Sequence, residues 1–143
     1  MKTRSSLFVI AFVGAFAFAS NPAFAQSPSR DDVKTILGVW KGGMPGDPPG
    51  SIELTITASK ITGRNARTGK NLGAGTYDLD PAKGTIDAFG IENPVRGRTY
   101  YGVYSLEGNT LKWCANSRTK RRPADLTHRP DKDQWLMILI RQR

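Results

Sequence analysis

Apolar and polar residues alternate in short runs over most of the chain, as expected for β-strands. Between Ser51 and Ala58, the apolar residues Ile52, Leu54 and Ile56 fall on one face and polar residues fall on the other. Regularly spaced short strands with turn signals between them predict an antiparallel barrel or sandwich. The other expected strands are Gly38–Lys41, Ile61–Arg64, Thr76–Leu79, Gly84–Ala88, Thr99–Glu107, Thr110–Ala115 and Gln134–Arg141.

The clearest hairpin has Gly108-Asn109 as its two-residue turn. Such a turn selects mirror-image hairpin geometry and fixes the register of the two strands. It sets Tyr104 opposite Trp113, on the face that we expect to lie in the interior. The last strand, Gln134–Arg141, is apolar on both faces. Closing the sheet into a barrel would keep that strand from acting as an open edge.

The first 25 residues have the layout of a cleavable secretory signal peptide. Lys2 and Arg4 precede an apolar run over residues 7–18, and Ala23-Phe24-Ala25 offers small residues at the cleavage site. The apolar run is shorter than the about 20 residues that a transmembrane helix needs. The sequence therefore predicts an exported protein, periplasmic or extracellular, with no transmembrane segment after cleavage. An uncleaved N-terminal anchor is the alternative.

Cleavage after Ala25 would leave 118 of the 143 residues, which suits one domain of modest size. Residues 26–35 are expected to form a polar leader and the start of a short helix, and residues 36–143 the barrel domain. Cys114 is the only cysteine, so the chain cannot form an internal disulfide. We expect Cys114 to be a small, buried apolar residue in a strand.

The exported chain would be strongly basic. Lys2 and Arg4 account for two of the 21 basic residues, so 19 would remain against 12 acidic ones. An excess of this size favours anionic partners, such as an envelope component or an anionic small molecule. Nucleic acid is not expected as a partner, because the chain lacks the interleaved aromatic residues of single-strand binders and because the predicted compartment is wrong.

The long polar connection over residues 116–133 carries the densest group of basic side chains. In a barrel this connection lies at a rim, where its side chains could capture an anion or bind an envelope polymer. A solvated surface loop is the alternative interpretation. The anion-binding candidates are Arg118, Lys120, Arg121 and Arg122.

We find no catalytic constellation and no metal site in the sequence. The single histidine, His128, has no cysteine or carboxylate at metal-ligand spacing, and nothing near it would orient it as a general base. Asp78 and Asp80 share a strand face and could form a pair of carboxylates, but we favour a solvated pair beside the turn at Pro81. We therefore expect a binding protein rather than an enzyme, with no cofactor.

Several motifs resemble those of known families. Gly38-Val39-Trp40 resembles the Gly-x-Trp signature of lipocalins. A longer series is similar to a bacterial family of secreted lipocalin-like domains of unknown function, whose members read Gly-Thr-x-x-x-Asp-Pro, Gly-x-Tyr-x-Leu-x-Gly-x-Thr-Leu-x-x-Cys and then Arg-Pro. In this chain the matching segments are Gly75–Pro81, Thr85–Asp87, Gly102–Cys114 and Arg122-Pro123, followed by an apolar strand that ends in Arg141.

The resemblance covers nearly all of residues 36–141 and carries no assigned activity. It implies an all-β fold, an eight-stranded antiparallel up-and-down barrel with a short N-terminal helical turn. It also implies that a basic side chain near the chain's end covers the tryptophan of the first strand. In this sequence those two structural residues would be Arg141 and Trp40.

Tyr77, Tyr104 and Trp113 are the candidates for lining a ligand cavity. An interior of eight strands can be filled by side chains or can hold one small ligand, and the sequence leaves both options open. One hypothesis is a carrier of a small, partly apolar ligand, with the basic rim favouring an anionic one. The other is an envelope-associated interaction protein with a filled barrel and a basic binding surface. A cavity of about 300 Å³ or more would favour the carrier.

Overall fold

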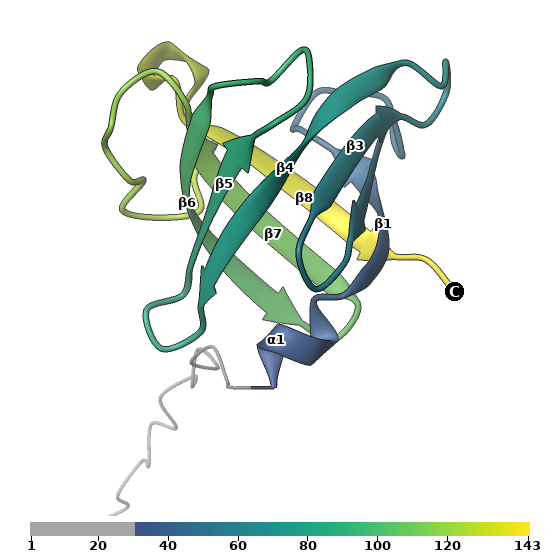
Figure 1. Cartoon of the computed structure of the whole chain (residues 1–143), viewed down its shortest axis with the longest axis horizontal. Coiled ribbons are helices and arrows are strands. Elements are labelled where there is room, and N and C mark those ends of the chain that lie inside the picture. The colour runs from purple at the N-terminus through teal and green to yellow at the C-terminus, as the bar shows by residue number, and fades with distance from the viewer. Residues whose placement is uncertain (1–30) are drawn as a thin grey trace, which may run out of the picture.

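The alternating segments pair in chain order and form a closed antiparallel barrel (Figure 1). The structure is a computed structural model that describes residues 31–143; the predicted signal peptide, residues 1–25, lies outside them. This is the up-and-down architecture of lipocalin-like folds. The elements are α1 (Asp32–Thr35), β1 (Gly38–Gly43), β2 (Ile52–Ile56), β3 (Ile61–Asn65), β4 (Asn71–Asp80), β5 (Thr85–Gly90), β6 (Thr99–Glu107), β7 (Thr110–Asn116) and β8 (Trp135–Arg141), with a 3-10 turn at Pro130–Lys132.

Both sequence-based pairings that define the barrel are confirmed. The turn at Gly108-Asn109 sets Tyr104 opposite Trp113 in the β6–β7 ladder. The first and last strands share a ladder in which Trp40 pairs with Arg141, so the sheet closes and the sandwich alternative is excluded. Closure leaves β8 with a partner on each side, as its apolar sequence requires.

β4 is longer than predicted, because it begins at Asn71 rather than at Thr76. Gly73 and Gly75 lie within the strand, where they allow close approach of neighbouring residues. A Cβ atom on Gly75 would lie 2.3 Å from the carbonyl oxygen of Phe89, and one on Gly73 would lie 2.5 Å from a methyl carbon of Val95. These glycines therefore act as spacers rather than as turn residues.

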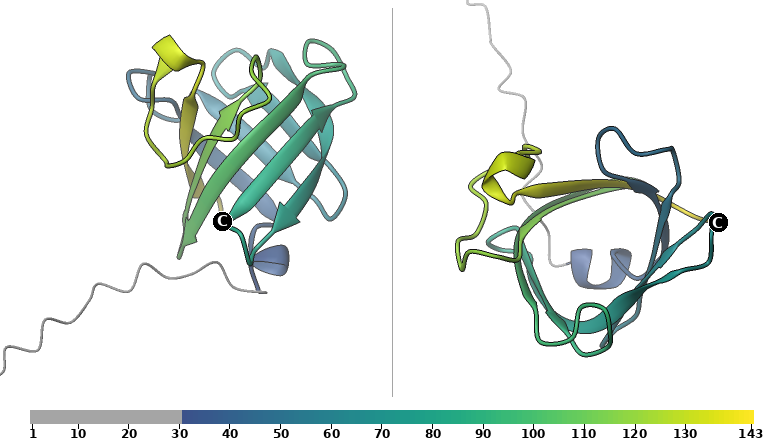
Figure 2. Two further views of the ribbon diagram at one scale, coloured as in Figure 1. Left: turned by 90° about the vertical axis from the view of Figure 1, so that its left-hand side faces the viewer. Right: turned by 90° about the horizontal axis from the view of Figure 1, so that it is seen from above.

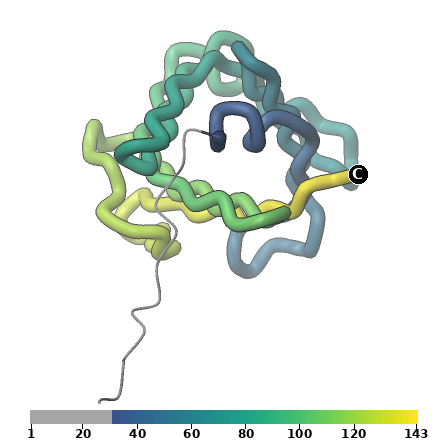
Figure 3. The backbone as a smooth tube through the Cα atoms, turned by 90° about the horizontal axis from the view of Figure 1, so that it is seen from below, coloured from purple at the N-terminus to yellow at the C-terminus, as the bar shows by residue number. Residues whose placement is uncertain are grey.

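The two ends of the barrel differ. At the helix end, short turns join the strands and α1 lies across the opening (Figures 2 and 3). At the loop end, four longer connections cross between strands: residues 44–51, 66–70, 91–98 and 117–134. The last of these also runs along the outside of the barrel (Figure 2). No helix in residues 31–143 is long and apolar enough to cross a membrane.

Trp40 closes the helix end, where its side chain is completely buried. The Arg141 guanidinium lies over the indole ring, 4.2 Å from its centroid, which confirms the stacking implied by the family resemblance. Arg141 also donates hydrogen bonds to the carbonyl oxygens of Leu37, at 2.8 Å, and Thr35, and the Trp40 indole N–H donates to that of Ile36 at 2.8 Å. These carbonyls end the α1 turn and need such partners.

Candidate functional site: a cavity at the loop end

A cavity of about 420 Å³ occupies the loop end of the barrel. Its lining is almost entirely apolar, which suits the body of a small organic ligand. Two of its residues, Arg98 and Trp135, are exposed, so the cavity is bordered by surface residues there. The apolar and aromatic lining comprises Met44, Ile52, Leu54, Ile61, Leu72, Val95, Tyr100, Trp113, Trp135 and Met137.

The cavity exists because one wall of the barrel carries very small residues. Strands β3, β4 and β5 contribute glycines and alanines where a filled barrel would place large side chains, whereas β6, β7 and β8 contribute the aromatic rings. Interior space that side chains do not occupy stays available for a ligand. The small residues of this wall are Gly63, Gly73, Ala74, Gly75, Ala88 and Gly90.

Of the three predicted lining residues, Trp113 lines the cavity and Tyr77 and Tyr104 do not. Tyr77 donates from its hydroxyl to the carbonyl oxygen of Thr57, at 2.6 Å, in the turn between β2 and β3 at the helix end. The Tyr104 hydroxyl bonds the buried Asp32 carboxylate in α1 at 2.9 Å. Both rings therefore belong to the filled half of the barrel.

The surroundings of these two tyrosines at the helix end favour the protonated form of their hydroxyl groups. Burial raises the pKa of Tyr104 strongly, and the neighbouring Asp32 carboxylate raises it further. Burial also raises the pKa of Tyr77. Neither hydroxyl is poised to lose its proton at neutral pH, so both serve as structural hydrogen-bond donors.

Three polar side chains border the cavity: Arg98, Tyr100 and Ser117. Sequence reasoning did not select them. The signal that could have found Arg98 is the inward alternation of β6, in which Tyr100, Gly102 and Tyr104 share one face. Extending that alternation by two residues toward the N-terminus places Arg98 on the same face, at the mouth.

The four residues of the predicted basic rim do not lie together, because their loop runs partly along the outside of the barrel. Arg122 does not lie at the rim, because it is bound to the outer wall of the barrel. Its guanidinium pairs with both carboxylate oxygens of Asp87, one of them at 2.8 Å, and donates to the carbonyl oxygen of Gly102 at 2.8 Å. The hydrogen bonds to Asp87 raise the pKa of Arg122. Its position fastens the loop to β5 and β6.

The other three cations of the predicted rim are exposed. Arg118 is paired with Asp133 of the same loop, at 3.4 Å. Lys120 and Arg121 have no ion pair with any residue of the described chain, so their charges remain available to solvent or to an anionic partner. The structure thus gives Arg122 a structural contact and leaves Lys120 and Arg121 as surface charges.

The same loop covers Cys114 and His128. Cys114 is fully buried on the outer face of β7, 3.6 Å from the carbonyl oxygen of Thr127, and burial raises the pKa of its thiol. His128 accepts a hydrogen bond at Nδ1 from the backbone N–H of Leu136, at 3.2 Å, and its ring packs edge-on against Trp135. Both residues therefore take part in contacts between the loop and the barrel.

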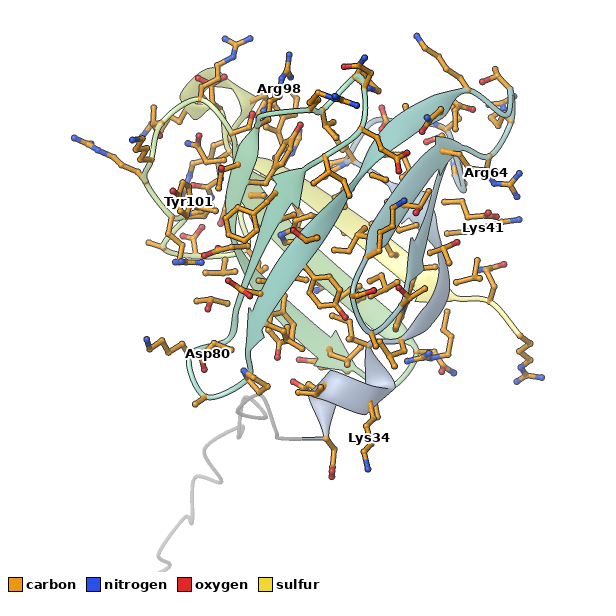
Figure 4. The ribbon with its side chains drawn as sticks, in the orientation of Figure 1. Lys34, Lys41, Arg64, Asp80, Arg98 and Tyr101 are labelled. Atoms are coloured by element: carbon orange, nitrogen blue, oxygen red, sulfur yellow. The ribbon has the colours of Figure 1, made fainter. Side chains whose placement is uncertain are left out.

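Two acidic side chains, Glu53 and Asp80, also have structural partners. Glu53, on the outer face of β2, accepts a hydrogen bond from Arg64 at 2.6 Å and lies 3.3 Å from the Lys41 ammonium, which ties β1, β2 and β3 together (Figure 4). The hydrogen bond from Arg64 and the nearby Lys41 lower the pKa of Glu53, against the effect of burial. Asp80 accepts hydrogen bonds from the backbone of the turn that follows it.

No group of three histidine, cysteine, aspartate or glutamate side chains in residues 31–143 could hold a metal ion. Comparison of the chain with protein-family models, with curated proteins and with solved structures gives no match. The cavity and its lining therefore carry the functional inference.

Proposed function

We propose that this protein is an exported lipocalin-like carrier that binds one small, partly apolar ligand inside its barrel. The observation that carries the proposal is the cavity of about 420 Å³ with an apolar lining, because ligand sites of proteins fall in the range of roughly 300–1,000 Å³. The proposed export rests on the signal-peptide layout of residues 1–25. The resemblance to secreted bacterial lipocalin-like domains supports the export and the barrel fold, but it carries no assigned activity.

The contrast between the packed helix end and the hollow loop end favours a carrier over a surface binder. The helix end supplies a packed, hydrogen-bonded base in Trp40, Tyr104 and Arg141, so the loop end can remain hollow without loss of the fold. If each non-hydrogen atom of a ligand takes the about 30 Å³ that a water molecule occupies in the liquid, the cavity has room for roughly a dozen such atoms. The alternative function assumed a filled barrel, and the cavity counts against that assumption.

Occupation of the cavity can be tested on protein purified from the periplasm of its own host. Native mass spectrometry should detect a co-purifying small molecule in the wild-type protein. Ala88 lines the cavity on β5, so Ala88→Leu should fill part of it and reduce the bound fraction by tenfold or more. Thr76→Leu is the matched control, because Thr76 is exposed on the neighbouring strand and does not line the cavity.

The two cavity tryptophans, Trp113 and Trp135, offer a second readout. Binding of a small apolar probe such as 1-octanol should change their fluorescence, and Ala88→Leu should suppress that change. If purified protein carries no small molecule, and wild type and Ala88→Leu respond identically to the probe, the carrier function is rejected.

A further inference from the structure

Arg98 differs from the other cations of the protein in its position. Among residues 31–143 it is the only charged residue that lines the cavity, and it lies directly before β6 at the loop end (Figure 4). It has no ion pair within the described chain, whereas Arg118 and Arg129 pair with Asp133 and Asp125. A guanidinium at the mouth of an apolar cavity, without a carboxylate partner from the protein, can pair with an anion of a ligand.

Two hydroxyl groups accompany Arg98 on the same wall. The β6–β7 ladder ends with the pair Tyr101 and Asn116, and Tyr100 and Ser117 are the residues next to this pair toward the mouth. Both line the cavity, and neither side chain makes a hydrogen bond to another described residue. One cation and two neutral donors therefore border one side of an otherwise apolar cavity, which is the arrangement that orients a ligand with one polar end.

The charge of the loop end favours an anion as well. Apart from Arg122 on the outer wall, its four connections, residues 44–51, 66–70, 91–98 and 117–134, contain nine basic and five acidic residues. A mouth of one predominant sign attracts ligands of the opposite sign and speeds their association. No acidic side chain of the described chain lines the cavity, so a cationic ligand would find no partner there.

We propose that the ligand is an amphiphilic monocarboxylate, with its carboxylate on Arg98 at the mouth and its apolar body inside the barrel against Trp113. This inference rests on the proposed carrier function and names its ligand class. The planar fork of a guanidinium matches the two oxygens of a carboxylate. A single cation at the mouth neutralises a single negative charge, and Tyr100 and Ser117 offer hydroxyl donors on the same wall.

Octanoate and 1-octanol test the proposal, because they differ at the polar end and share an alkyl chain. Titrations followed by Trp113 and Trp135 fluorescence or by calorimetry should give tighter binding of octanoate, by about tenfold, as expected for hydrogen bonds to a charged group. Arg98→Gln should remove this preference and leave 1-octanol binding unchanged. Arg98→Lys should keep part of it, because the charge remains and the fork is lost.

Arg96→Gln is the matched control. Arg96 is an exposed cation in the same loop, two residues from Arg98, and it does not line the cavity. It should leave both affinities within about twofold of wild type. Added salt should weaken octanoate binding and spare 1-octanol in the wild-type protein, a comparison that needs no variant.

The possible results separate the two proposals. Equal affinities of the wild type for octanoate and 1-octanol, or a preference that survives in Arg98→Gln, would overturn the carboxylate site and leave the carrier function standing. Failure of both compounds to bind would overturn the carboxylate site. It would overturn the carrier function as well only if purified protein also carries no small molecule.

Discussion

The helix end and the loop end of this barrel are made by the same eight strands, yet one is packed and the other is hollow. At the helix end, inward positions carry large side chains whose polar atoms bond to α1 or to the two residues after it, as in Trp40, Tyr104 and Arg141. At the loop end, the inward positions of β3, β4 and β5 carry glycine and alanine. Strand alternation decides which side chains point inward, and side-chain size then decides whether the interior is filled.

The difference also concerns polar groups. At the helix end, Arg141 donates to backbone carbonyls and stacks on Trp40, so its hydrogen-bonding capacity is used within the protein. At the loop end, the Arg98 side chain makes no ion pair and no hydrogen bond within residues 31–143, and it lies beside an apolar cavity. The two arginines show that the same residue type can close one end of a barrel and serve as a candidate ligand contact at the other.

The largest expected effect is the loss of stability when a tryptophan is replaced by alanine, and it should differ between the two ends. Trp40→Ala should lower the free energy of unfolding by about 3–5 kcal/mol, because it removes a completely buried ring and leaves a cavity. Trp135→Ala at the loop end should cost less than about 2 kcal/mol, since that side chain is 38% exposed and borders existing empty space. Urea unfolding of both variants measures the difference. Equal losses would contradict the packing contrast.

High pH should weaken the helix end. The raised pKa of Tyr104 means that the folded state holds its hydroxyl proton more tightly than the unfolded state, so its contribution is complete below about pH 10 and is lost as the pH rises above that value. Above pH 10 the free energy of unfolding should fall by about 1.4 kcal/mol per pH unit for each tyrosine held neutral.

Tyr104→Phe should remove part of that slope. At neutral pH the same variant should cost about 1–3 kcal/mol, because the buried Asp32 carboxylate loses a hydrogen-bond donor. Urea unfolding at pH 7 and at two values above pH 10 provides the measurement. An unchanged slope in Tyr104→Phe would mean that Tyr104 ionises as readily in the folded as in the unfolded chain.

A conservative substitution probes the closure of the helix end more finely. Arg141→Lys keeps the charge but loses the planar group that lies over Trp40 and reaches the carbonyls of Thr35 and Leu37. It should lower the free energy of unfolding by about 0.5–2 kcal/mol, which is the range of cation–π contacts from exposed sites to desolvated ones. Arg143→Lys, at the exposed chain end, is the control and should be neutral. A neutral Arg141→Lys would leave the charge alone as the stabilising feature.

The sequence predicted the ladders of the barrel better than it predicted the cavity. The Gly108-Asn109 turn fixes its register locally, and the family resemblance implied the contact between Trp40 and Arg141. Alternation gives the face of a residue but not its depth along the barrel axis. Tyr77 and Tyr104 do point inward, yet they lie at the helix end, beyond the cavity.

Glycine was the second source of error, because one residue type has two roles in such a barrel. The predicted strand Thr76–Leu79 does not include Gly73 and Gly75, whereas both are strand residues of β4 that admit the close approach of Val95 and Phe89. The path of a long loop is also not encoded in local pattern. The ion pair of Arg122 with Asp87 joins residues 35 positions apart, and no periodicity of the sequence reports it.

The smallest expected effect on stability concerns the basic side chains of the loop end, and it distinguishes the exposed ones from Arg122, which has a structural contact. Replacing Lys120 and Arg121 together with serine should change the free energy of unfolding by less than about 0.5 kcal/mol, because both are exposed and neither has an ion pair within residues 31–143. Arg122→Ser should cost more, since it releases the loop from Asp87 and from the Gly102 carbonyl.

Adsorption to anionic envelope material at low ionic strength should respond in the opposite order, because the free charges of Lys120 and Arg121 are the ones that an external anion can reach. Thermal unfolding and a salt-dependent adsorption assay on the two variants measure both properties. Adsorption that is unchanged in the double variant would leave Lys120 and Arg121 with no role in anion binding, and would direct attention to Arg98 at the cavity itself.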